Sequence, residues 1–272
     1  MTRALLALVL AAVGTSAFAQ APVPAPASPS SGYGIVDNSF LLEEAFNQEP
    51  GVVQNIFGLQ RARHEWVASF TQEWPAPGMR HQLSYTVPFG AAGDGTGIGD
   101  VLVNYRFQAM TEAPGRPAFS PRVSVILPTA GATTGLGGGT TAVQVGLPFS
   151  KRTGDFYLHL NVGFTFFPAH VPMGDTRQQS SLLDGMIGAS IIRRLSPTFN
   201  VFLEAILAST EEPSMAGSVR SRDVTLSPGF RTAVNLGEKQ FVWGLAAPMI
   251  ISGDATEAAV FVYLSYELPF KK

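Results

Sequence analysis

The stretch HQLSYTVPF, residues 81–89, decides the fold that we expect for this chain. Its even positions are small or polar, and its odd positions carry larger, mostly apolar side chains: His81, Leu83, Tyr85, Val87 and Phe89. Successive side chains of a β-strand point to opposite faces, so this strand has one apolar face and one polar face. Which face meets water depends on the rest of the sequence.

The same alternation returns along most of the chain. It predicts ten further strands at residues 66–74, 99–109, 119–127, 140–149, 155–166, 181–193, 198–209, 223–233, 240–249 and 258–270. Most of these runs are longer than the usual five or six residues of a globular strand. They reach the length of roughly ten residues that a tilted strand needs to cross a bilayer.

The connections between these strands alternate in length. Short ones include PAPGM (75–79), KRTG (151–154) and SP (196–197). The long ones are GAAGDGTGIG (90–99), TAGATTGLGGG (129–139), PAHVPMGDTRQQ (168–179) and TEEPSMAGSVRS (210–221). Short turns at one end and long loops at the other are typical of an up-and-down outer-membrane barrel.

A soluble β-sandwich also alternates apolar and polar residues, but its apolar face lies inside. Here the polar face consists mainly of Gly, Ser, Thr, Gln and Asn, rather than the Lys and Glu that cover soluble surfaces. Only 14% of the residues are charged, against roughly 25% in soluble proteins. Trp66 and Trp74 share one face, about 20 Å apart along the membrane normal, close to the spacing of two aromatic girdles. We therefore predict an all-β, antiparallel transmembrane β-barrel over residues 52–272.

Strand number and the last strand extend this prediction. Bacterial single-chain barrels have an even number of strands, so a twelfth is needed, and VVQNIFGLQRA (52–62) is the only candidate. The last strand carries Tyr266, Leu268 and Phe270 on one face. It resembles the aromatic C-terminal strand by which the outer-membrane assembly machinery recognises barrels, which makes that machinery and the lipid bilayer expected partners.

The N-terminus is typical of an exported bacterial protein. Arg3 precedes the apolar run ALLALVLAAV (4–13), and AFA (17–19) offers small residues for cleavage. We predict a signal peptide at residues 1–19 and an outer-membrane location, because the apolar run is too short to span a bilayer. Residues 20–36 are rich in Pro, Ala and Ser and are expected to form a linker.

The stretch DNSFLLEEAFNQEPG (37–51) differs from the strands. Residues 37–39 suit a helix N-cap, Glu43 and Glu44 suit the first turns, and Pro50 with Gly51 would end the helix. We expect a short helix at the periplasmic mouth. The alternative is a plug folded into the lumen.

Parts of the sequence resemble a known family. The stretches are DNSFLLEEAFNQEPGVVQN, FTQEWPAPGMRHQLSYTVPF and GIGDVLVNYRF, within residues 37–107. They are similar to the outer-membrane proteins grouped under the MetA pathway of phenol degradation, a transporter family. The resemblance implies an outer-membrane barrel loosely grouped with channels for hydrophobic compounds, and it supplies no established binding residues.

Signatures of enzymes and cofactors are weak. The Gly-rich stretch GDGTGIGD (93–100) lacks the Lys-Ser/Thr of a phosphate loop, and there is no Cys. The His residues do not have metal-ligand spacing. His81 and Ser84 fall on opposite faces, and His159 has no Ser two residues away, although a Ser on a neighbouring strand stays open. We expect no enzyme, cofactor, metal or nucleic-acid partner, with an outer-membrane lipid-modifying enzyme as a remote alternative.

The charged residues of the polar faces are the candidate site. They point into the expected lumen: Glu73, Asp100, Arg106, Arg122, Asp184, Glu204, Arg231 and Glu267. One hypothesis is that they pair and hold the barrel interior together, because unpaired buried charge is costly. The other is a selectivity constriction in a channel for small solutes, hydrophobic or aromatic ones among them. A non-conducting structural or surface-binding barrel is the alternative function.

Overall fold

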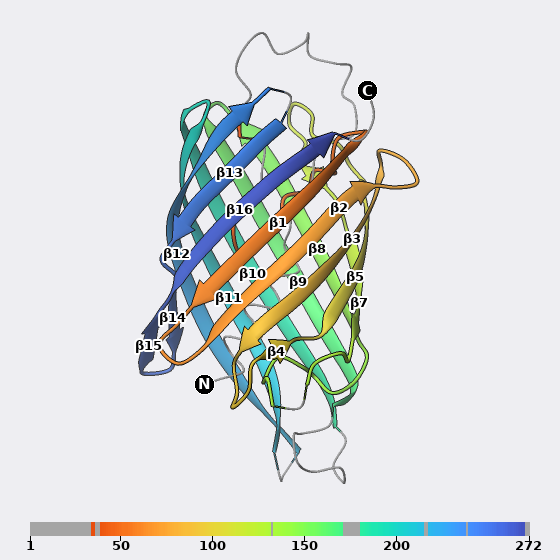
Figure 1. Ribbon diagram of the computed structural model, residues 1–272, viewed down its shortest axis with the longest axis vertical. Coiled ribbons are helices and arrows are strands. Elements are labelled where there is room, and N and C mark those ends of the chain that lie inside the picture. Colours follow the sequence, from red (N-terminus) through yellow and green to blue (C-terminus); the bar gives the residue numbers. More distant parts are fainter. Residues whose placement is uncertain are drawn as a thin grey trace.

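The computed structural model describes a closed antiparallel barrel (Figure 1). The described residues are 34–35, 39–131, 133–170, 180–214, 217–237 and 239–269. The predicted signal peptide and most of the linker lie outside them. No helix long and apolar enough to cross a membrane occurs in this part of the chain. The strands are β1 Val52–Arg61, β2 Trp66–Pro75, β3 His81–Ala91, β4 Gly97–Ile98, β5 Val101–Phe107, β6 Ala118–Phe119, β7 Arg122–Leu127, β8 Ala142–Thr153, β9 Phe156–His170, β10 Ser180–Ser196, β11 Phe199–Ser214, β12 Gly217–Leu236, β13 Lys239–Ala246, β14 Met249–Ser252, β15 Ala255–Ala258 and β16 Val260–Pro269.

Twelve strand positions make up the barrel wall. β13 and β14 occupy one position, because both pair with β12, and β15 and β16 occupy the next. β4 and β6 are short additions beside β3 and β8. The wall closes where β1 pairs with β16 from Val52↔Pro269 to Arg61↔Val260. The twelve-stranded barrel is therefore confirmed, including the first strand that parity alone had demanded.

The two faces of the strands lie as the alternation predicted. On β9, Leu160 and Phe164 point outward and are 44% and 47% exposed, whereas His159 and Asn161 point inward and are buried. Lumen-facing and outward-facing residues alternate in the same way around the wall. The apolar belt is thus on the outside, as expected for a surface that meets lipid.

The two rims of the barrel differ. β1 begins and β16 ends at the upper rim in Figure 1. We call it the short-turn rim, because residues 154–155 and 197–198 make tight connections there. The predicted loop at 210–221 is wrong, since β11 and β12 run on to Ser214 and from Gly217. Arg220 pairs with Glu211 opposite it (2.5 Å), and such charged pairs make an extended strand look like a loop in the sequence.

The helix predicted at 37–51 is also wrong. Residues 39–49 have no regular secondary structure, and residues 39–48 are buried. Residues 36–38, which include most of the expected N-cap, lie outside the described part. The physical reason is that side chains of the barrel wall, rather than carbonyls of the same segment, accept the backbone N–H groups of this stretch, as described below.

The assignment of faces leads to a first prediction. Phe164→Arg places a charge on the outer face near the middle of β9 and is expected to cost about 2–4 kcal/mol of folding free energy in a bilayer. Thr165→Arg is the matched control, since Thr165 lines a cavity in the lumen. Unfolding by urea in lipid vesicles measures both variants. Equal losses, or a larger loss for Thr165→Arg, would contradict the assignment.

Candidate functional site in the lumen

Residues 39–48 cross the lumen without regular secondary structure, and we call this segment the strap. Its backbone N–H groups donate to side chains of the wall, beginning at Leu41, which donates to Glu204 Oε1 on β11 (2.8 Å). Glu43 N donates to Asn161 Oδ1 on β9 (3.0 Å) and Ala45 N to Ser150 Oγ on β8 (2.8 Å).

The far half of the strap is held in the same way. Asn47 N donates to Gln108 Oε1 (3.1 Å), and Gln48 N donates to Gln82 Oε1 on β3 (2.7 Å). Carbonyls are also satisfied: Asn161 Nδ2 donates to Glu43 O (2.9 Å). These side chains come from β3, β8, β9 and β11 and from Gln108 next to β5, so the strap conformation depends on the assembled barrel.

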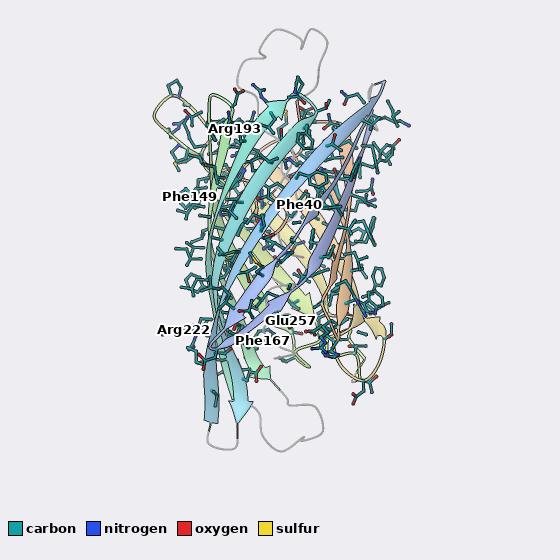
Figure 2. The ribbon with its side chains drawn as sticks, turned by 90° about the vertical axis from the view of Figure 1, so that its left-hand side faces the viewer. Phe40, Phe149, Phe167, Arg193, Arg222 and Glu257 are labelled. Atoms are coloured by element: carbon teal, nitrogen blue, oxygen red, sulfur yellow. The ribbon has the colours of Figure 1, made fainter. Side chains whose placement is uncertain are left out.

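Apolar contacts anchor one end of the strap. The ring of Phe40 lies 4.6 Å from that of Phe202 and is stacked on Tyr263 at 4.7 Å. Figure 2 shows Phe40 in the interior of the barrel, whereas Phe149 lies at the outer surface. A Cβ at Gly244 would lie 2.5 Å from Phe40 Cζ, so the glycine leaves room for this ring. The anchor belongs to a cluster of buried hydrophobic residues inside the barrel.

Charge pairing holds the middle of the strap. Glu43 Oε1 accepts from Arg122 Nε (2.8 Å) and lies 2.6 Å from its Nη2, while Glu43 Oε2 is paired with Arg106. All three side chains are almost fully buried. Arg122 also donates to Gln144 Oε1 (2.8 Å). Two guanidinium groups thus bind one carboxylate, which makes the interaction strong and fixes its geometry.

A cavity of about 60 Å³ lies beside this ion cluster. Glu43 and Arg122 form part of its lining, together with polar groups of β8 to β11 such as Gln144, Asn161 and Thr165. Its apolar lining comes from Ile126, Phe167, Met186, Ile206 and Ala208. The mixture of an apolar wall with a few polar groups is typical of small-molecule sites.

The predicted site residues divide into two groups. Arg106, Arg122 and Glu204 meet the strap directly, and Glu73 accepts from Gln82 (2.9 Å), which also binds the strap.

The second group lies away from the strap. Asp184 lines the cavity and accepts from Glu211 N (2.8 Å). Asp100 instead organises the long-loop rim, where it accepts from Ala130 N and Gly138 N. Arg231 and Glu267 lie on the lumen side of β12 and β16. The predicted charged residues therefore do not form one ring.

Sequence reasoning missed the central carboxylate. Glu43 belongs to the stretch that looked like a helix, so it was not among the candidates. Asn161, which binds the backbone of Glu43, is a neutral residue and gave no sign of a buried carboxylate. One sequence signal for this carboxylate was available. Arg106 and Arg122 lie directly opposite each other on neighbouring strands, and two buried arginines this close together require an acidic partner.

The neighbouring-strand serine that the sequence left open is Ser150. Its Oγ lies 2.8 Å from His159 Nδ1 and also accepts the backbone N–H of Ala45. Both side chains are buried, and neither belongs to the lining of the cavity. The hydroxyl thus binds the strap at Ala45 and is itself held by His159.

Comparisons with known proteins identify the fold. No protein-family model matches the sequence, and a search of curated proteins finds no match. The structure is similar to an outer membrane channel from Pseudomonas putida F1, with a TM-score of 0.65, 11% identity, and coverage of 81% of this chain and 96% of that one. It is also similar to the NanC porin, with a TM-score of 0.55, 9% identity, and coverage of 79% and 100%. The class that the fold defines is the outer-membrane β-barrel, which includes channels and porins.

Proposed function

We propose that this protein is an outer-membrane channel of a Gram-negative bacterium, closed at rest by its strap. The observation that carries the proposal is the amphipathic cavity inside the barrel, whose lining includes Glu43 of the strap. An amphipathic cavity inside a barrel suits small solutes, hydrophobic or aromatic ones among them. The similarity in fold to an outer membrane channel supports the same function.

Location and partners follow from the same proposal. The apolar outer belt is made for lipid, and the sequence of residues 1–19 suits an export signal. Tyr266 and Leu268 of β16 suit recognition by the barrel-assembly machinery, while Phe270 lies outside the described residues. The resemblance to the proteins of the MetA pathway of phenol degradation favours aromatic solutes.

A second candidate function is a non-conducting barrel. The same strap favours it, because its hydrogen bonds to the wall and its buried ion cluster make a firmly held segment. In that case the loops of the opposite rim would carry the function. The remote alternative of a lipid-modifying enzyme has only the Ser150–His159 pair in its favour, and that pair is engaged by the strap.

Liposome swelling and single-channel recording separate these functions. We expect the mature wild-type protein to admit small aromatic solutes that do not readily cross lipid unaided, such as benzoate, and to have a low ion conductance in planar bilayers. The heat-modifiable gel shift of a closed barrel confirms that each preparation is folded. A folded barrel with neither solute entry nor conductance, with or without the strap, would refute the channel and leave the structural barrel.

A further inference from the structure

The carboxylate of Glu43 contacts Arg106 and Arg122 in the way that a bound ligand would. One of its oxygens meets two nitrogens of Arg122, and the other meets Arg106. The carboxylate is brought there by a chain segment that is not part of the wall. Guanidinium groups arranged in this way are a general binding site for carboxylates. The two arginines belong to the barrel, whereas their present partner belongs to the strap.

A trough leads away from this carboxylate along the wall. Arg122 on β7 pairs with Gly146 on β8, Gly146 with Gly163 on β9, and Gly163 with Met186 on β10. All four residues line the cavity. Neighbouring strands lie roughly 4.8 Å apart, so the row spans about 14 Å from β7 to β10. A Cβ at Gly146 would lie 3.5 Å from Arg122 Nη2 and from Glu43 Oε1, so this glycine lies directly beside the ion cluster.

The far end of the trough is apolar and adaptable. A Cβ at Gly163 would lie 3.1 Å from Met186 Cγ, so the Met186 side chain lies over this glycine. Methionine is flexible and adjusts its shape to a ligand. Ile206 and Phe167 also line the cavity. Asp184 is the further acidic group in the lining, and it disfavours a second negative charge on a ligand.

We propose that Arg106, Arg122 and the glycine trough form a binding site for amphipathic monocarboxylates, which Glu43 occupies in the closed state. The ligand places its carboxylate on the arginines and its hydrocarbon part along Gly146 and Gly163. It thereby displaces Glu43 and loosens the strap. This inference rests on the proposed channel function, for which it names the solute class. Because Glu43 is tethered, it competes at a high effective concentration and lowers the apparent affinity for a free acid.

The test compares 4-phenylbutyrate with its neutral analogue 4-phenylbutyramide by titration calorimetry on the mature protein in a maltoside detergent. Glu43→Gln removes the competing charge and is expected to raise the affinity for 4-phenylbutyrate about tenfold, with no gain for the amide. Adding Arg122→Gln to this variant is expected to abolish the gain. Glu112→Gln is the matched control, because Glu112 pairs with Lys151 outside the lumen site. An unchanged affinity in Glu43→Gln, or equal gains for acid and amide, would overturn the proposal.

A second measurement does not depend on the folding of Glu43→Gln. The sequence contains no Cys, so Ala45→Cys places a single thiol on the strap. We expect 4-phenylbutyrate to accelerate labelling of this thiol by a water-soluble maleimide several-fold, and the amide to leave it unchanged. Equal rates with both probes would overturn the displacement of the strap. Binding in detergent does not require conduction, so the two proposals can fail separately. If the barrel binds the acid but never conducts, only the channel function is refuted. If the barrel conducts but does not bind the acid, only this binding site is refuted.

Discussion

Deletion of residues 39–48 is expected to raise the single-channel conductance of the barrel about fivefold or more, because the strap crosses the lumen at the height of Arg106 and Arg122. The deletion also removes Glu43, which leaves both guanidinium groups facing water without their carboxylate. The open lumen is therefore expected to prefer anions. Single-channel recording with a salt gradient across the bilayer measures conductance and preference together.

Deletion of an equal length of the predicted linker, residues 22–31, is the control for this experiment. That stretch is rich in Pro and Ala, and its loss is expected to leave the conductance at the wild-type value. The strap deletion must fold and show the heat-modifiable shift. If it then still conducts like the wild type, the lumen is narrowed by another part of the protein.

Arg106→Ala is expected to have the second large effect. Arg106 is fully buried, pairs with Glu43 and donates through Nη1 to Glu44 O (2.7 Å). Removal of one partner of a buried ion cluster costs about 3–5 kcal/mol, so the free energy of unfolding should fall by roughly this amount. The loosened strap should also let ions pass. Its carboxylate, which has lost one of its two arginines, should make the pore prefer cations, whereas the strap deletion should make it prefer anions.

Two measurements on Arg106→Ala separate structure from transport. Urea unfolding in vesicles gives the stability, and reversal potentials in planar bilayers give the ion preference. Arg193→Ala is the matched control, because Arg193 is exposed near the short-turn rim and should change neither quantity much (Figure 2). A loss of stability with an unaltered ion preference would mean that the cluster only holds the barrel interior together.

Much of the barrel was predictable because alternation is a local property of each strand. The run at 155–166 shows its lipid face directly in Phe156, Leu158 and Leu160, and the structure places these residues outside. The weak alternation of 52–62 was compensated by the even strand number. The break between β13 and β14 was not predicted, because the altered pairing near Pro248 depends on β12 and β15 rather than on the stretch itself.

The strap was not predictable from the same local signals. The local sequence indicates a helix through its N-cap residues, two early glutamates and a terminal Pro-Gly. These signals contain no information about side chains of distant strands that accept hydrogen bonds from the backbone of the segment. The side chains of Glu204, Asn161, Ser150 and Gln82 come from four strands and meet the segment only after the barrel has closed. Of the eight candidate charges, Arg106, Arg122 and Glu204 contact the strap, whereas their partner Glu43 was hidden by the helix prediction.

The most direct test of the central claim, that residues 39–48 occupy the lumen at rest, is thiol labelling of folded Ala45→Cys in vesicles with a water-soluble maleimide. Ala45 is fully buried, and Gly78→Cys provides the control, because Gly78 lies exposed in the β2–β3 turn with open space for a side chain. We predict that Cys at position 78 reacts at once when the reagent has access to both sides, whereas Cys at position 45 reacts about a hundredfold more slowly, in line with protection by a few kcal/mol of local stability. Equal labelling rates at the two positions would contradict the account.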